Sequence, residues 1–236
     1  SSFLLESDKT YEASIKLGFR SNTGDSEGVI VDLNVQHLPA LKEIKETLKQ
    51  FSGMQEQTPP MYSALKFKGK PLYEYARKGE EIERKKRSIN IVSLDLVDYS
   101  DNVLKITVEC SKGTYIRTLA SDIGDKLNTG GYLIALRRTA IGSVNVEQAK
   151  TLDMIEASDK EARDALIFPI DEFLNYLDDI SLVPSAEEAI KDGKTLLFKE
   201  MKEGIYRLYN KDKFFLGLGT LDRHGYLKVR RLLALS

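Results

Sequence analysis

Residues 104–127 combine a strand pattern and a helix pattern with only residues 111–115 between them. From Leu104 to Cys110, apolar and polar residues alternate, which is typical of a β-strand with one buried face. From Ile116 to Leu127, apolar residues recur at helical spacing, and the pattern stops before a Gly-Gly pair. The sequence therefore predicts a strand that leads almost directly into a helix packed by its apolar face.

Arg117 falls in the first turn of that expected helix, close to Lys112 and Tyr115. A cation at this end of a helix opposes the helix dipole, which favours negative charge there. One interpretation is that the guanidinium holds a carboxylate or a phosphate. The other is a surface arginine paired with a nearby glutamate, and the residues alone leave both interpretations open.

Composition excludes several classes of protein. At 236 residues, the chain can bury one large core or two unequal ones. One cysteine cannot form an internal disulfide, and with only two histidines we expect no metal site. There is no phosphate-binding or dinucleotide glycine motif, so we expect no cofactor. No apolar run reaches membrane-spanning length and no signal peptide is recognisable, so we expect a cytoplasmic protein without a membrane partner.

The coarse pattern along the chain predicts an α+β fold. Alternating apolar residues predict strands at residues 11–19, 29–31, 89–96 and 103–110. An amphipathic helix is expected between Pro39 and Gly53. Short strands separated by turns follow at residues 205–208, 214–218 and 226–229. We therefore expect an antiparallel-rich mixed sheet with flanking helices over residues 1–177, and a small β-barrel domain over residues 178–236.

Residues 54–87 differ in composition from the rest of the chain. Between Ser63 and Arg87, nine Lys or Arg accompany four Glu, a local charge of +5 in a chain of formal net charge −1. Aromatic and basic side chains interleave here, which is typical of segments that stack on bases and contact phosphates. They are Tyr62, Lys66, Lys68, Lys70, Tyr73, Tyr75 and Arg77. The alternative is a helix packed by its apolar face, with solvated lysines.

Several blocks of the chain, taken in order, resemble the TruB-type tRNA pseudouridine synthases. Residues 7–11 (SDKTY) resemble the block that supplies an active-site tyrosine, and residues 110–118 (CSKGTYIRT) the block that supplies an arginine. Residues 61–77 resemble an RNA-gripping thumb insert, which we assign to residues 54–87. Residues 136–138 (LRR) resemble a block that places a leucine under the target base, and the last sixty or so residues resemble an RNA-binding PUA domain.

This resemblance implies the pseudouridine synthase fold and a cofactor-free isomerisation of uridine 55 in the T-loop of tRNA. Tyr11, Arg117 and Leu136 would be the catalytic residues of this chain, although Tyr11 and Leu136 alone read as core residues. The resemblance also implies a monomer that binds the tRNA T-arm. Further RNA contacts would come from the thumb aromatic and basic residues and from Lys9, Lys112, Tyr115 and Arg137.

The nucleophile of this family is an aspartate in a Gly-Thr-Leu-Asp-Pro type motif located before the tyrosine block. That position falls before Ser1, so we expect the nucleophile upstream and the chain as given to be inactive. Asp222 follows a similar Gly-Thr-Leu but precedes Arg223, and we interpret it as a turn residue. The alternatives are an RNA-binding or tRNA-folding module without catalysis, a guide-RNA-dependent relative acting on another RNA, and a protein-interaction domain.

Overall fold

The computed structural model describes residues 2–233, which form two compact units, Ser1–Ala149 and Lys150–Ser236. The helices of the first unit are α1 (Ser2–Glu6), α2 (Leu41–Lys49), α3 (Leu72–Ala76), α4 (Ile116–Lys126) and the 3-10 helix η1 (Val146–Gln148). Its strands are β1 (Lys9–Leu17), β2 (Phe19–Ser21), β3 (Ile30–Asp32), β4 (Gly53–Gln57), β5 (Lys66–Phe67), β6 (Lys70–Pro71), β7 (Arg87–Ser100), β8 (Val103–Cys110), β9 (Gly131–Ile141) and β10 (Val144–Asn145).

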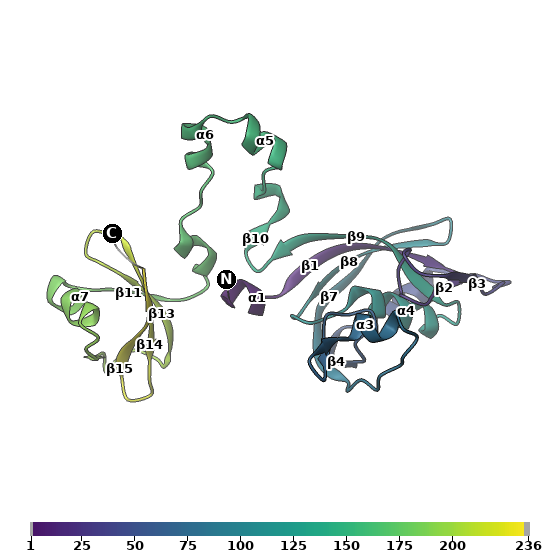
Figure 1. The fold of residues 1–236 in the computed structure, drawn as a ribbon, viewed down its shortest axis with the longest axis horizontal. Coiled ribbons are helices and arrows are strands. Elements are labelled where there is room, and N and C mark those ends of the chain that lie inside the picture. Colours follow the sequence, from purple (N-terminus) through teal and green to yellow (C-terminus); the bar gives the residue numbers. More distant parts are fainter. Residues whose placement is uncertain (1, 234–236) are drawn as a thin grey trace. The chain divides into compact units, whose positions relative to one another are not determined.

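Six strands of the first unit form one sheet in the order β10-β9-β1-β8-β7-β4, and every neighbouring pair is antiparallel (Figure 1). β1 lies in the middle, where Tyr11 is opposite Val108 of β8 and Arg138 of β9. Register shifts beside Tyr11 and Ser14 show that β9 follows β1 irregularly. The expected antiparallel-rich α+β fold is therefore confirmed.

Helices α2 and α4 cover one face of this sheet with a common core. The buried residues include Ile15, Ile44, Leu104, Ile106, Leu119 and Ile123. α4 lies very close to the start of β9, because a side chain on Gly124 would come within 2.3 Å of the Gly130 backbone. The helix ends in a Schellman motif, with Asn128 at φ 58° as the left-handed residue. The packing of α4 against the sheet and its Schellman end together fix where the first turn of α4 lies.

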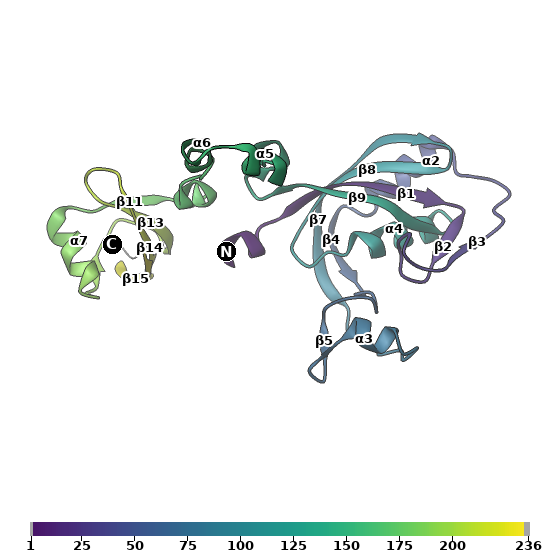
Figure 2. The ribbon, with the colours of Figure 1, turned by 45° about the horizontal axis from the view of Figure 1, so that its top comes forward.

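The predicted insert leaves the sheet later than expected, because β4 pairs with β7 and only residues 58–86 depart from it. We call residues 58–86 the thumb. Its hairpin of β5 and β6 turns at Lys68 and Gly69, whose positive φ values of 47° and 83° suit a tight two-residue turn. Figure 2 shows β5 and α3 standing away from the sheet.

The second unit contains α5 (Leu152–Ala157), α6 (Lys160–Ala165), η2 (Ile170–Leu174), β11 (Asp179–Ser181), α7 (Pro184–Lys191), β12 (Leu196–Leu197), β13 (Gly204–Tyr209), β14 (Phe215–Leu221) and β15 (Tyr226–Leu232). Its strands form a sheet in the order β11-β13-β14-β15-β12. β11 and β12 lie at the two edges, so the expected barrel is an open, curled sheet. It has its own core, including Ile180, Leu182, Leu208 and Leu216.

Some details differ from expectation. Residues 150–177 belong by their contacts to the second unit, while a functional boundary at residue 177 stays a prediction. Thr151 caps α5, since its Oγ1 accepts the Met154 N–H at 3.2 Å. Leu152 begins this helix and is 76% exposed. β9 was not predicted at all, because residues 134–138 in its middle are all exposed and show no alternation of apolar and polar types.

Candidate active site

Arg117 is the second residue of α4, and its guanidinium joins three segments far apart in the sequence. Nη1 lies 2.7 Å from Asp25 Oδ2 and donates to Thr23 O at 3.4 Å. Nη2 donates to the main-chain oxygen of Tyr62 at 2.7 Å. Both members of the ion pair are largely buried, with 25% of the Arg117 and 20% of the Asp25 side chain exposed. Arg117 is therefore a largely buried side chain paired with an aspartate, and its catalytic role stays a prediction.

That carboxylate, Asp25, belongs to the loop between β2 and β3. Burial alone would raise its pKa, but hydrogen bonds from Thr23 and Arg117 and from the Glu27 N–H lower it, and the net shift is downward. The Thr23 hydroxyl donates to Asp25 Oδ1 at 2.6 Å. Gly24 at φ 78° brings the loop against the helix, where an added side chain would lie 3.3 Å from Arg117 Cβ. The site is therefore a preorganised ion pair.

A buried amide fixes the start of α4. Gln57 ends β4 and is only 4% exposed. Its Oε1 accepts the Tyr115 N–H at 2.8 Å, and its Nε2 donates to Tyr115 O at 3.1 Å. Tyr115 is the N-cap residue of α4, so these two bonds satisfy its backbone without a side-chain cap. Gln57 thus positions Arg117 two residues further on.

Tyr11 lies near the beginning of β1, at the end of the sheet where β8 leads toward α4. Burial raises the pKa of its phenol, the neighbouring Cys110 raises it further, and a hydrogen bond with the Arg138 side chain partly offsets both. Cys110 itself is buried, and its pKa is raised to about 11, chiefly by burial. Tyr11 is therefore a protonated phenol held between a buried thiol and a guanidinium.

Leu136 and Arg137 lie on opposite faces of β9. Leu136 is opposite Ala13 and shares the face of Tyr11 and Arg138, whereas Arg137 is opposite Glu12. Leu136 is 46% exposed, more than a core residue would be. Arg137, Glu12 and Leu136 all line a hollow of about 370 Å³. Of the two adjacent arginines, Arg138 is the one beside Tyr11, and no sequence pattern distinguished it from Arg137.

The remaining predicted lysines near the sheet have partners within the chain. Lys9 Nζ donates to three main-chain oxygens at the end of α1, those of Leu4, Leu5 and Ser7, at 2.6–3.3 Å. Lys112 forms an ion pair with Glu6. Both side chains are thus held at the base of α1, and their contact with RNA stays a prediction.

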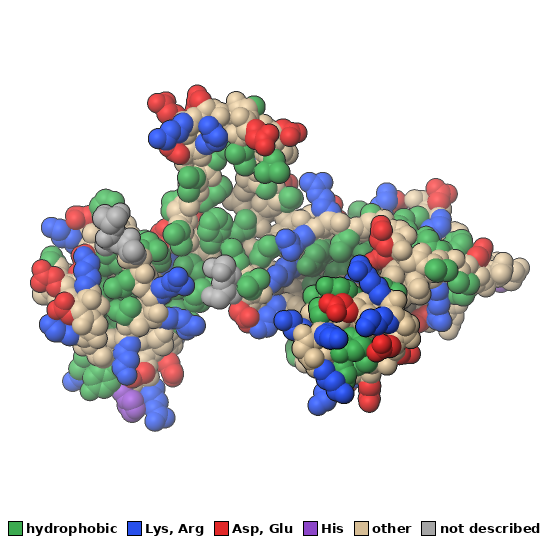
Figure 3. Space-filling model, viewed as in Figure 1, with side chains coloured by type: hydrophobic (Ala, Val, Ile, Leu, Met, Phe, Trp, Pro, Cys, Tyr) green, Lys and Arg blue, Asp and Glu red, His purple; other side chains and the backbone are tan. Residues whose placement is uncertain are grey.

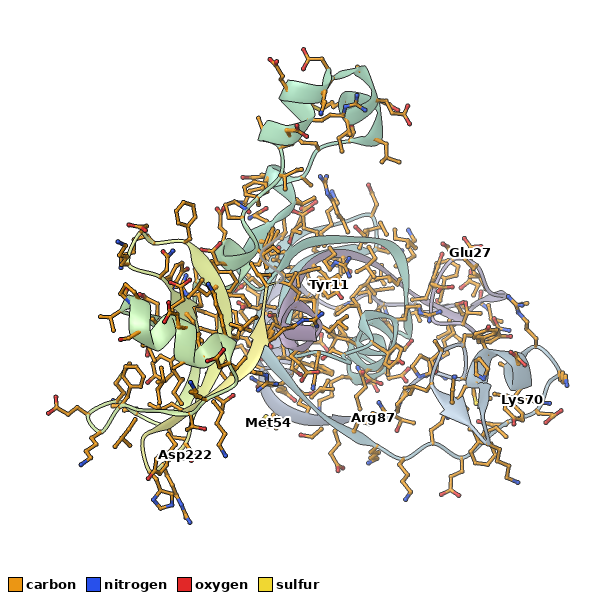
Figure 4. All side chains as sticks on the ribbon, turned by 60° about the vertical axis from the view of Figure 1, so that its left-hand side comes forward. Tyr11, Glu27, Met54, Lys70, Arg87 and Asp222 are labelled. Carbon is orange, nitrogen blue, oxygen red and sulfur yellow. The ribbon has the colours of Figure 1, made fainter. Side chains whose placement is uncertain are left out.

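The predicted thumb residues fall into two groups. Tyr73 and Tyr75 pack within the thumb, since the Arg77 guanidinium lies over Tyr73 and the Tyr75 ring meets Phe67 edge-on at 5.9 Å. The exposed lysines lie on the hairpin, and Figure 4 shows Lys70 there, well away from Tyr11. Met54 and Arg87 lie on the paired strands β4 and β7. Figure 3 shows Lys and Arg mixed with acidic side chains over α3 and β4.

Asp222 lies in the turn between β14 and β15. Asp222 accepts the N–H groups of His224 and Tyr226 at 2.9 and 3.0 Å, so it is a turn residue as expected. Among residues 2–233, no group of three or more His, Cys, Asp or Glu is arranged to hold a metal ion. No helix in that range is both long and apolar enough to cross a membrane.

Sequence reasoning missed Asp25 and Gln57. Thr23, Gly24 and Asp25 stand in a stretch of turn-forming residues, where an aspartate is ordinarily a turn residue. Gln57 stands just before two prolines and carries no pattern of its own. The available signal was indirect, because an arginine at an unfavourable helix end indicates an anionic partner without identifying it.

Comparison with known families matches the chain over almost its whole length. Residues 1–116 match the TruB family pseudouridylate synthase N-terminal domain. Residues 117–175 match the tRNA pseudouridylate synthase B C-terminal domain, and residues 179–233 the C-terminal domain of pseudouridine synthase II TruB.

Individual relatives give the same result. The tRNA pseudouridine synthase B of Azoarcus sp. (strain BH72) is 45% identical over 236 residues, which cover 99% of this chain and 77% of the relative. That of Aromatoleum aromaticum is 43% identical and is covered to 75%. Among solved structures, a Cbf5-Nop10-Gar1 complex matches with a TM-score of 0.72 at 20% identity, covering 98% of this chain and 68% of that one.

Proposed function

Because this chain belongs to the TruB family of pseudouridine synthases, we propose that it isomerises uridine to pseudouridine in tRNA, at position 55 of the T-loop. The observation that carries the proposal is the part-buried guanidinium of Arg117, held by Asp25 at the start of α4. The relatives extend beyond the matched stretch, and the chain covers 77% of the Azoarcus protein. We place the aspartate nucleophile upstream of Ser1, and the reaction in the cytoplasm with a monomeric enzyme.

The reaction breaks the bond between N1 of uracil and C1′ of ribose and forms a bond between C5 and C1′. The proton on C5 is lost and N1 gains one, so no electrons are exchanged with a cofactor. An aspartate nucleophile allows this through a covalent intermediate, and the target nucleotide must first leave the T-loop stack.

Arg117 has donors to spare for such a nucleophile. A guanidinium carries five N–H donors, and its contacts with Asp25, Thr23 and Tyr62 use three of them. The others remain for a second carboxylate, which a guanidinium would keep ionised and oriented. Asp25 holds the guanidinium in place for that task, so we assign it as a positioning residue.

Tyr11 and Leu136 support the roles proposed for them by sharing one face of neighbouring strands. The Tyr11 phenol would lie against the extruded uracil and take part in removing the C5 proton. Leu136 is exposed enough to contact a base. The thumb lysines Lys66, Lys68 and Lys70 would contact phosphates of the T-arm.

The experiment that tests this proposal is tritium release from a T-arm RNA that carries 5-tritiated uridine. We expect no release with the chain as given and release once the upstream segment of the full protein is present. Release without that segment would contradict the placement of the nucleophile. Binding without release in either form would instead favour an RNA-binding module. The identity of 45% to a tRNA pseudouridine synthase B, against 20% or less for the Cbf5 complexes, favours tRNA over other RNAs.

A further inference from the structure

A cavity of about 330 Å³ opens beside Arg117, between the thumb and the β2–β3 loop. The lining residues that matter here come from both ends of the thumb and the first turn of α4: Thr58, Glu81, Arg84, Arg117 and Thr118. Arg117 is paired with Asp25, and Arg84 makes only a long contact with Glu81. Of the two guanidiniums, Arg84 is therefore the one with the weaker internal partner.

Arg84 is poorly satisfied for a side chain that is only 21% exposed. Its Nε is buried and has no hydrogen-bond partner within residues 2–233. Among the same residues, its Nη2 donates a long hydrogen bond to Glu81 Oε1 at 3.3 Å. A buried donor of a charged group without an acceptor is costly, so an acceptor from outside the chain would relieve this cost.

Glu81 marks where that acceptor would bind. Its side chain is 82% exposed, so an exposed carboxylate stands at the mouth of the cavity and gains little from a pair with Arg84. An anion with more acceptor oxygens would displace it. Thr58 and Thr118 bring hydroxyl groups to the same walls, and hydroxyls and guanidinium N–H groups are the ordinary donors to phosphate oxygens.

We propose that this cavity is a subsite for a phosphodiester group of the bound RNA, with Arg84 as its cation and Glu81 as the internal anion that the phosphate displaces. This inference rests on the proposed action on RNA. It adds an RNA contact at residues 81–84, where the thumb leads back to the sheet. It implies that RNA binding replaces the Glu81–Arg84 pair, so the same cation pairs within the thumb in the free protein and with the phosphate in the complex.

The test is a double-mutant cycle on binding of a T-arm RNA to the full-length protein, measured by fluorescence anisotropy over a series of salt concentrations. Arg84→Gln should weaken binding about tenfold at low salt and reduce the salt slope by about one. Arg84→Lys should keep most of the slope. Glu81→Gln should tighten binding when Arg84 is present and have no effect in the Arg84→Gln background.

Lys85→Gln is the matched control, because it removes the same charge one residue away, from an exposed side chain outside the cavity. An equal loss of slope in Lys85→Gln would overturn the subsite in favour of general attraction, and so would a Glu81→Gln effect that survives without Arg84. If the parent protein fails to bind the RNA at all, the proposed function fails. If it binds and the cycle shows no coupling, only this inference does.

Discussion

At the scale of single residues, the site is organised around one guanidinium whose helix position is unfavourable. The ion pair with Asp25 offsets the unfavourable interaction of Arg117 with the helix dipole. The same pair helps to lower the pKa of the Asp25 carboxyl. A depressed carboxyl pKa stabilises the fold above the unfolded pKa, and this stabilisation is lost as pH falls through the folded value. The pair is therefore intact at neutral pH.

Replacing Asp25 with Asn should release Arg117 without changing the shape of the loop. In the full-length protein we expect tritium release to fall roughly tenfold or more. The difference in free energy of unfolding between parent and variant should shrink as pH falls from about 4, the ordinary pKa of the unfolded carboxyl, through the lowered pKa of the folded one. A difference that does not change with pH would show that the loop depends on shape instead of charge.

This residue-scale result also shows how far the sequence leads. Arg117 could be singled out because its charge conflicts with its helix position, a conflict that local rules make visible. Asp25 could not be singled out, because an aspartate among Asn, Thr, Gly and Ser is an ordinary turn residue. Its partner is 92 residues away, and no local pattern contains that distance.

At the scale of elements, the junction of β4 and α4 carries the site. Gln57 connects the two through both main-chain groups of Tyr115. β8 and α4 were predictable because their apolar residues recur at the regular spacing of a strand and of a helix. The end of β4 was not, since its exposed residues carry no alternation of apolar and polar types.

Gln57→Ala should therefore leave the Tyr115 N–H without its partner, while Tyr115 O keeps the bond from the Leu119 N–H at 3.0 Å. We expect a loss of about 1–3 kcal/mol in the free energy of unfolding, and slower tritium release because Arg117 shifts with the helix. Gln55→Ala is the matched control on the same strand: its Nε2 is buried and already without a partner, so its removal should cost far less. Equal losses in the two variants would remove Gln57 from its positioning role.

At the scale of the whole molecule, the chain holds two separate cores. The first contains the single cysteine, Cys110, whose burial and raised pKa both suppress reaction with alkylating reagents. The second is built around residues such as Leu208. The existence of a second β module was predictable from its turns, whereas the strand order of either sheet was not, because pairing depends on contacts between distant segments.

This arrangement predicts that labelling of Cys110 reports on the first core alone. Leu104→Ala should lower the denaturant concentration at which the thiol reacts with iodoacetamide, since a core truncation of this type costs about 2–5 kcal/mol. Leu208→Ala should cost a similar amount in the second core and leave that midpoint unchanged. A shift of the midpoint in Leu208→Ala would show that the two cores unfold as one.

The bond from Arg117 to Tyr62 ends on a main-chain oxygen. Because that acceptor belongs to the backbone, no exchange of side chain at position 62 can delete it. A lineage can therefore vary residue 62 to suit a different RNA surface and still inherit the connection between the base of the thumb and Arg117. At this position the contact depends on the path of the backbone, and the type of side chain is free to change.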